Sequence, residues 1–294
     1  MKLEKRCSLI VAFGIIGLAV PFGNAFALDA ATYVGAETCV ACHSEKGESF
    51  KNSPHGKKIP LVKKIEFTKT CETCHGPGSL HAAAAGDKSN PGFATIKNPA
   101  KMAGDALAET CFTCHKQKEV MQWNTGTHSA KGLTCAKCHS VHDGHGPKNL
   151  KLSPTDTCLQ CHKSKKMDIN LPSHHPIIEG KMTCVDCHNP HGGANGNLKA
   201  ETVNETCFKC HAEKAGPFAN EHPPVTENCT ICHKPHGSAN QQMLKYPMPY
   251  LCITCHKMEH AVTGSSKVID LIKRNCFDCH KDIHGSESSK AWGH

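Results

Sequence analysis

Apolar residues are scattered along most of this chain. Leu9 to Val20 form a mainly apolar run, but later apolar positions are separated by Gly, Pro, Lys, Asn and Ser. A chain of 294 residues would normally bury a large aliphatic and aromatic core, or divide into two such cores. The pattern therefore predicts an elongated molecule, mostly coil with short α-helices and almost no β-structure. The apolar mass of its core must come from something other than side chains.

The N-terminal run has the features of an export signal. Three basic residues precede it, and Ala25-Phe26-Ala27 follows it as a cleavage site of the A-x-A type. The run is short for a membrane-spanning helix, which needs ~20 residues, so an uncleaved anchor is the weaker alternative. We expect residues 1–27 to be a signal peptide and residues 28–294 to form the mature exported domain, which keeps 20 of the 21 cysteines.

Every cysteine after residue 27 belongs to a C-x-x-C-H motif. Disulfides, zinc ribbons and redox-active pairs do not require a histidine after each second cysteine. A c-type haem does require it, because the two thiols bond to the vinyl groups of the macrocycle and the adjacent histidine binds the iron. Ten motifs therefore predict ten covalently bound c-type haems. The predicted thioether cysteines are Cys39, Cys42, Cys71, Cys74, Cys111, Cys114, Cys135, Cys138, Cys158, Cys161, Cys184, Cys187, Cys207, Cys210, Cys229, Cys232, Cys252, Cys255, Cys276 and Cys279, and the proximal iron ligands are His43, His75, His115, His139, His162, His188, His211, His233, His256 and His280.

Thirteen histidines lie outside the motifs, and ten of them recur at similar offsets. Six follow a motif closely and four lie about a dozen residues after one, so these ten are predicted to be the distal iron ligands. They are His55, His81, His128, His142, His175, His191, His222, His236, His260 and His284. His145, His174 and His294 are left over, with His145 an alternative to His142 and His174 an alternative to His175. The methionines, which can also bind haem iron, show no repeated placement.

The motifs repeat in pairs, which predicts five stacked two-haem units. Their approximate bounds are 39–81, 111–142, 158–191, 207–236 and 252–284. The fifth unit departs from the pattern, because His260 follows its first motif closely. Residues 81–108, rich in Gly, Pro and Ala, are expected to be a loop. The Thr or Asn before the first cysteine of nine motifs predicts a helix that starts at the motif, with this residue as its N-cap.

The histidines that closely follow a motif are too near it to serve the same iron. His142 is three residues after His139, and three extended residues span at most ~11 Å. Two ligands on opposite faces of one haem need Cα atoms about 12 Å apart, with the chain also passing round the ring. His142, and likewise His191 and His236, are therefore predicted to bind a neighbouring haem. Which distal histidine serves which iron stays open.

The formal net charge of +8 would by itself point to nucleic acid or a membrane surface. Loss of residues 1–27 leaves about +6, and a ferric haem with two histidine ligands and two propionates adds about −1. Ten such haems bring the total to about −4. The lysines are then expected to serve as propionate partners and solvated surface, and binding to nucleic acid is excluded.

Iron with two histidine ligands has no position left for a substrate. If all ten haems are of this kind, the protein is an electron carrier and not an enzyme. A multihaem reductase is the alternative, since nitrite reductases and hydroxylamine oxidoreductases keep one open haem, sometimes through a C-x-x-C-K variant. No such variant occurs here. A structural or storage role is a third, weaker possibility.

Several stretches resemble the MtrA/DmsE family of decahaem periplasmic cytochromes. They are Glu205–Pro217, Glu221–Gly237, Met182–Gly192 and Trp123–His128, within a similarity that extends from Thr38 to Gly285. The resemblance implies a multihaem cytochrome c with a core of stacked haems, and it favours His175 over His174. It also implies extracellular respiration, or metal oxidation or reduction, through an outer-membrane β-barrel porin. The partners would be that porin, an extracellular multihaem cytochrome and a periplasmic or inner-membrane cytochrome donor, without direct lipid contact. The alternative is a free periplasmic shuttle.

Overall fold

The computed structural model describes residues 30–117, 119–143, 146–256, 276–278 and 280–288. The predicted signal peptide lies outside these residues, as do the predicted thioether cysteine Cys279 and the predicted distal ligand His260. His145 and His294, two of the three histidines left over by the ligand count, also lie outside them.

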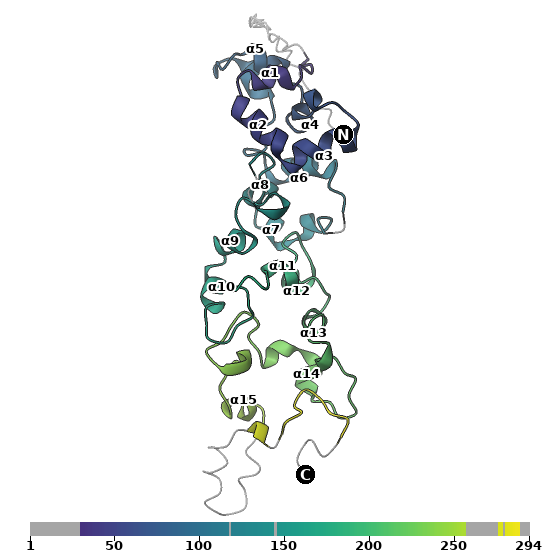
Figure 1. Ribbon diagram of the computed structural model, residues 1–294, viewed down its shortest axis with the longest axis vertical. Coiled ribbons are helices and arrows are strands. Elements are labelled where there is room, and N and C mark those ends of the chain that lie inside the picture. Colours follow the sequence, from purple (N-terminus) through teal and green to yellow (C-terminus); the bar gives the residue numbers. More distant parts are fainter. Residues whose placement is uncertain (1–29, 118, 144–145, 257–275, 279, 289–294) are drawn as a thin grey trace, which may run out of the picture.

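The described residues form an elongated body in which the chain advances along the long axis (Figure 1). The colours pass in order from purple to yellow down the body, so that segments close in sequence are also neighbours in space. The longest described helix, α3 (Pro54–Lys63), has only ten residues, and the described residues contain isolated β-bridges but no strand. The predicted fold class, elongated with short helices and almost no β-structure, is therefore confirmed.

The helical elements are distributed over the whole described body. The N-terminal part of the described chain contains α1 (Ala36–Val40), α2 (Ser44–Asn52), α3, η1 (Phe67–Lys69), α4 (Cys71–His75), α5 (Ser79–Ala83) and η2 (Pro91–Thr95). The middle of the chain contains α6 (Gly104–Phe112), η3 (Trp123–Thr125), α7 (Thr127–Ala130), α8 (Cys135–Cys138), η4 (Pro147–Asn149), α9 (Pro154–Leu159), α10 (Lys163–Asp168), α11 (Cys184–Cys187) and α12 (Ala194–Asn197). The last part contains α13 (Val203–Phe208), η5 (Ala212–Lys214), α14 (Pro223–Glu227), η6 (Cys229–Ile231), η7 (Gln241–Met243), α15 (Tyr250–Ile253) and η9 (Cys276–Asp278).

The two motifs of each predicted unit sit on their helices in different ways. The second motifs start a helix, as predicted: α8 begins at Cys135 after Thr134, and Asn228 caps η6 by accepting a hydrogen bond from the Thr230 N–H. The first motifs instead end a helix that began several residues earlier, as in α6 and α13. The expected N-cap is wrong there, because Thr110 and Thr206 lie inside the helix and their hydroxyls donate to the carbonyl four residues before.

The segment 81–108, expected to be a loop, contains structure of its own. It includes the end of α5, all of η2 and the start of α6, and α5 packs against η2. Asn90 caps η2 by accepting a hydrogen bond from the Gly92 N–H at 2.8 Å. Two of the Gly and Pro residues that suggested a loop are instead the first residues of helices, Pro91 in η2 and Gly104 in α6.

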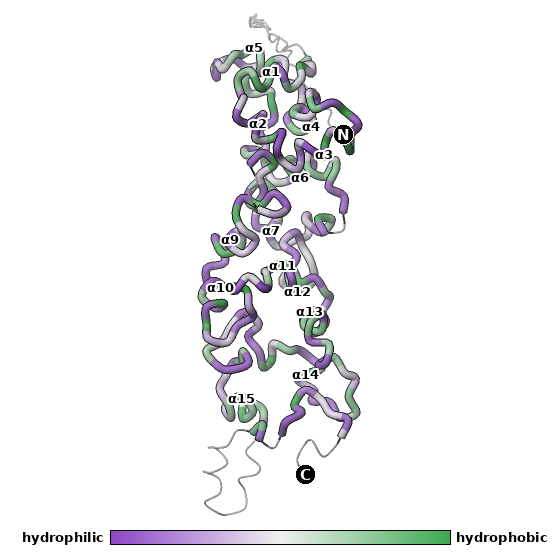
Figure 2. The backbone as a smooth tube through the Cα atoms, in the orientation of Figure 1, coloured by the Kyte–Doolittle hydropathy of each residue, from purple (hydrophilic) through white to green (hydrophobic). Residues whose placement is uncertain are grey.

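Few apolar side chains are buried in the described part of the chain. They are Ala36, Phe50, Ala84, Leu107, Ala108, Trp123, Ile169 and Leu244. Hydrophobic and hydrophilic segments alternate along the coloured part of the tube (Figure 2). None of the described helices has the length and apolar character needed to cross a bilayer. The side chains alone thus supply only small, separate clusters of apolar contact.

Candidate haem sites

Nine of the ten proximal histidines face a predicted distal histidine across a nearly constant gap. The ring centres in these pairs are 5.8–6.3 Å apart. The pairs are His43–His81, His75–His142, His115–His55, His139–His191, His162–His128, His188–His236, His211–His175, His233–His284 and His256–His222. The tenth proximal histidine, His280, is described, but its candidate partner His260 is not.

The gap between paired rings fits one iron held by two imidazoles. A metal–nitrogen bond to histidine is about 2.0 Å long, and the ring centre lies a further ~1.1 Å behind the nitrogen. Two rings on opposite sides of one metal therefore have centres about 6 Å apart. The donor set also fits, because each pair offers two imidazoles and each proximal histidine directly follows its cysteine pair. The residues present thus fit bis-histidine c-type haem.

The pairing links each predicted unit to the next in both directions. Four distal histidines reach back, so that His142, His191, His236 and His284 face the second-motif histidines His75, His139, His188 and His233 of the preceding unit. Four others reach forward, so that His55, His128, His175 and His222 face the first-motif histidines His115, His162, His211 and His256 of the following unit. Among the nine described pairs, only His81 faces a histidine of its own unit, His43.

Backbone carbonyls fix the orientation of many of these rings. Nδ1 of the proximal histidines lies near a carbonyl oxygen in four cases: His75 with Lys97, His139 with Lys148, His188 with Gly196 and His233 with Gln242, at 2.8–3.1 Å. On the distal side, His81 pairs in this way with Phe93, His128 with Pro190 and His175 with Pro235, at 2.7–2.8 Å. A proton on Nδ1 that donates to a carbonyl leaves Nε2 as the metal-binding nitrogen.

Two of these hydrogen bonds also tie the backward-reaching and forward-reaching histidines together. Nδ1–H of His128 donates to the carbonyl directly before His191, and Nδ1–H of His175 donates to the carbonyl directly before His236. Ser173 and Ser238 reinforce the second of these contacts, because their backbones form a pair of antiparallel hydrogen bonds at 2.8 and 3.1 Å. The two histidines that link neighbouring predicted units are therefore positioned as one assembly.

The side-chain partner of His55 is different. The amide of Asn149 lies 2.7 Å from His55 Nδ1, and Asn149 is itself buried. Asn149 was not singled out by the sequence, because its role depends on a contact between residues 94 positions apart.

The structure distinguishes His174 from its neighbour His175. His175 faces His211, whereas His174 Nε2 lies 3.0 Å from the Glu179 carboxylate and its Nδ1 lies near the Leu171 carbonyl. His174 therefore belongs to a local surface network. The geometry favours His175 as the member of a facing pair.

Burial favours the neutral imidazole on the distal side. Loss of water contact lowers the pKa of His55, His142, His191, His222, His236 and His284, and nearby imidazoles add to the effect. The neutral ring is the form that binds a metal. The same burial lowers the pKa of the proximal His139.

The cysteines of successive motifs are neighbours in a regular order. Within each unit the first cysteines of the two motifs interact: Cys39 with Cys71, Cys111 with Cys135, Cys158 with Cys184, Cys207 with Cys229 and Cys252 with Cys276. Between units the second cysteines interact: Cys74 with Cys114, Cys138 with Cys161, Cys187 with Cys210 and Cys232 with Cys255. These electrostatic interactions relate each motif to the next one along the sequence.

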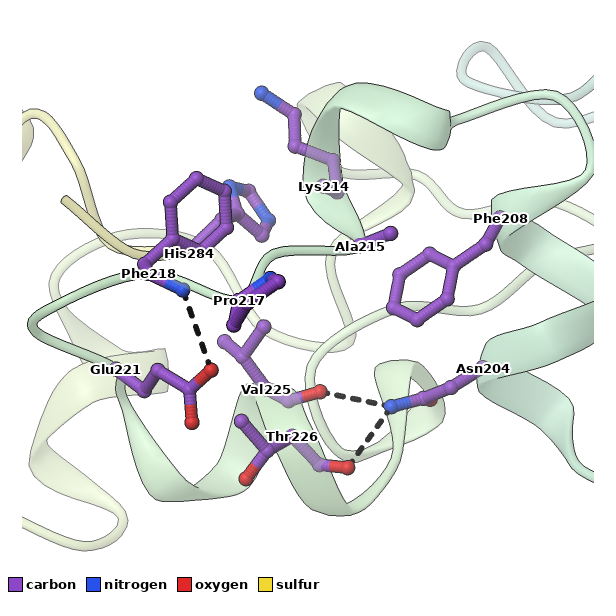
Figure 3. Close-up of a pocket in the computed structure, with 10 residues that line it drawn as sticks. All are labelled: Asn204, Phe208, Lys214, Ala215, Pro217, Phe218, Glu221, Val225, Thr226 and His284. Atoms are coloured by element: carbon purple, nitrogen blue, oxygen red, sulfur yellow. Dashed lines mark hydrogen bonds between the residues drawn. The ribbon is translucent and has the colours of Figure 1, made fainter. Parts of the chain in front are cut away.

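A cavity of ≈ 370 Å³ lies beside the seventh motif, which contributes Phe208 to its lining. Figure 3 shows the aromatic rings of Phe208 and Phe218 on its wall together with Val225 and His284, the ring that faces His233. Asn204 anchors this wall, since its amide donates to the Val225 and Thr226 carbonyls and its side-chain oxygen accepts from the Cys229 N–H at 2.8 Å. Apolar walls with a few fixed polar groups are typical of cofactor sites.

Sequence comparisons identify related proteins for much of the chain. A family defined by a doubled CXXCH motif matches residues 128–167, 174–216 and 222–261. The multihaem cytochrome MtrA of Shewanella baltica is 37% identical over 197 residues, which cover 66% of this chain and 58% of that protein. The multihaem cytochrome MtrC of the same organism is 24% identical over 179 residues, which cover 50% of this chain and 27% of that protein. The chain thus matches little more than half of the first relative and about a quarter of the second.

Proposed function

Since its doubled motifs and its likeness to MtrA make this chain an MtrA-like multihaem c-type cytochrome, we propose that it carries electrons along ten covalently bound haems. The ten C-x-x-C-H motifs would supply the twenty thioether bonds and the ten proximal ligands. The ten distal ligands would be those predicted above, and the motifs would form five two-haem units.

The facing histidine pairs carry this proposal. In each of the nine described pairs the two rings stand as far apart as the opposite axial ligands of one iron. Haem supplies an iron that cycles between ferric and ferrous forms and so holds one electron at a time. Because two imidazoles fill both axial positions, a substrate has no place to bind. The proposal is therefore an electron carrier and not an enzyme.

The cysteine neighbours support a row of sites in sequence order. Thiols that are close enough to affect one another's pKa hold neighbouring macrocycle edges close together. An elongated protein with ten sites in a row, each on the order of 10 Å across, can exceed the ~30 Å hydrocarbon thickness of a bilayer. Such a chain cannot meet lipid directly, because its coil would leave backbone groups without partners.

We further propose that the protein is periplasmic and sits within an outer-membrane porin. It would then pass electrons between a periplasmic or inner-membrane cytochrome and an extracellular multihaem cytochrome. The likeness to MtrA and MtrC supports membership of such a set of cytochromes. The runner-up is a free periplasmic shuttle.

The mass of the purified protein, together with its low-temperature EPR spectrum, tests the haem proposal. We expect the mass of residues 28–294 plus ten haems, and EPR signals from low-spin ferric iron alone. A high-spin signal accompanied by nitrite reduction would instead favour a reductase with one open haem.

Purification from membranes tests the conduit. We expect the holoprotein to co-purify with a membrane protein of porin size after detergent extraction of the outer membrane. Recovery of the whole pool as a soluble monomer from the periplasmic fraction would favour the shuttle.

A further inference from the structure

The second motif differs from the other nine at one position. The first of the two residues between its cysteines is Glu72. At the same position the other motifs have uncharged residues: Val40, Phe112, Ala136, Leu159, Val185, Phe208, Thr230, Ile253 and Phe277. A charge at a position that is otherwise mainly apolar requires a specific environment.

The structure provides this environment from backbone groups. Glu72 is only 4% exposed, and both carboxylate oxygens accept hydrogen bonds. Oε1 accepts from the N–H groups of Val34 and Gly78 at 3.0 and 2.9 Å, and Oε2 accepts from the Gly35 N–H at 3.0 Å. None of the ion pairs found in the described residues includes Glu72. Its charge is therefore held by dipoles and is not cancelled by a lysine or arginine.

The carboxylate lies close to the thiols where the first two motifs meet. Burial raises the pKa of Cys39, and the Cys71 thiol and the Glu72 carboxylate raise it further. Burial also raises the pKa of Cys71, and Glu72 adds to this rise. Each of these thiols would attach the edge of one haem. A charge close to both thiols is therefore close to both haems.

We propose that Glu72 is a fixed negative charge that lowers the reduction potentials of the two haems attached by the first and second motifs. This inference rests on the proposed function, because it concerns two of the ten proposed haems. Reduction adds an electron to the iron, and a nearby negative charge in a medium of low dielectric constant disfavours that addition. No other described motif carries a charge at this position, so the first two sites would differ from the rest of the row.

A purely structural role is the competing explanation, because Glu72 also ties residues 34, 35 and 78 to α4. A structural role predicts lost haem or lost stability when Glu72 is replaced, but no selective change in potential. The test must therefore measure potentials in a protein that keeps its haems.

The experiment is a spectroelectrochemical titration of the holoprotein and its Glu72→Gln variant. We expect about a fifth of the haem absorbance, which corresponds to two of the ten haems, to move to higher potential while the remainder is unchanged. Glu205→Gln is the matched control. The Glu205 carboxylate also accepts two backbone hydrogen bonds and lies two residues before a motif, but it is exposed to solvent. We expect no shift there, because water screens the charge.

Several results would overturn the inference. Unchanged potentials in a Glu72→Gln protein that keeps ten low-spin haems would do so, as would an equal shift of all ten. If this variant loses haem, Glu72→Thr, which has the side chain of the eighth motif, removes the charge in a different way. Loss of haem in both variants would make Glu72 an assembly residue and reject the role in potential. A wild-type mass short of ten haems would instead reject the proposed function.

Discussion

At the scale of single residues, the candidate sites depend on how each imidazole is aimed. Seven rings in the facing pairs have Nδ1 next to a backbone carbonyl, and His55 has the Asn149 amide in its place. Carbonyl oxygens accept a hydrogen bond but cannot donate one, so they select the tautomer that presents Nε2 to a metal. In these seven rings the backbone thus favours both the orientation and the tautomer that a metal-binding histidine needs.

His142 offers the sharpest test of ligation across units. Replacing it with glycine removes the ring that faces His75, and we expect one of the ten proposed haems to become high-spin and to bind carbon monoxide when reduced. EPR and absorbance titration with carbon monoxide measure both changes. Because the thioether bonds are untouched, the mass should still include ten haems.

His174→Gly serves as the control for this variant. His174 is paired with Glu179 instead of another imidazole, so all haems should stay low-spin in the variant. A new high-spin haem in His174→Gly, or an unchanged spectrum in His142→Gly, would contradict the pairing described here.

The sequence predicts which histidines belong to a facing pair far better than it predicts the partner of each one. Chain reach excludes His142 as the partner of His139, and the structure indeed pairs it with His75. The forward contact from His55 to His115 spans 60 positions, and no spacing rule identifies it. Such partners depend on how neighbouring units are stacked, which is a property of the folded chain.

At the scale of elements, the two kinds of motif helix explain a limit of the sequence analysis. A Thr precedes the first cysteine both in motifs that start a helix and in motifs that end one. This Thr alone therefore does not show where the helix begins. The helix that carries the seventh motif begins earlier, at the capping box formed by Thr202 and Glu205. This start has its own sequence signal, a Thr followed three residues later by Glu.

Removing that cap tests where α13 begins. We expect Thr202→Ala to destabilise the first turn of α13 by about 1 kcal/mol, because the Glu205 N–H loses its side-chain acceptor. Amide hydrogen exchange at Glu205 in the holoprotein should then quicken by roughly fivefold.

Thr110→Ala is the control for the cap. Thr110 lies inside α6 and its hydroxyl only donates to the Ala106 carbonyl, so exchange in the first turn of α6 should change little. Equal effects of the two substitutions would mean that Thr202 is not a cap.

At the scale of the whole molecule, neighbouring units are joined by contacts that cross between them. Lys46 and Ser49 of α2 both bond to Asp143, the residue after His142, at 2.7 and 2.6 Å. Ser49 also donates to the His142 carbonyl, which holds this histidine of the second unit against the first. Exposed contacts of this kind contribute little stability each, typically below ~1 kcal/mol. These contacts therefore position the histidines, and we infer that the main stabilisation of the fold comes from the proposed haems.

The chain without haem should for this reason not fold cooperatively. Its described α-helices have four to ten residues, which is too short to be stable alone, and its buried apolar side chains form only small clusters. We expect protein produced without haem attachment, and kept reduced, to lose its far-ultraviolet circular dichroism gradually on heating, whereas the holoprotein unfolds in one steep transition. The matched comparison uses the same residues 28–294 in both forms. A steep, reversible transition in the haem-free chain would mean that side-chain packing alone specifies the fold. The haems would then bind to a fold that forms without them, and they would not be its core.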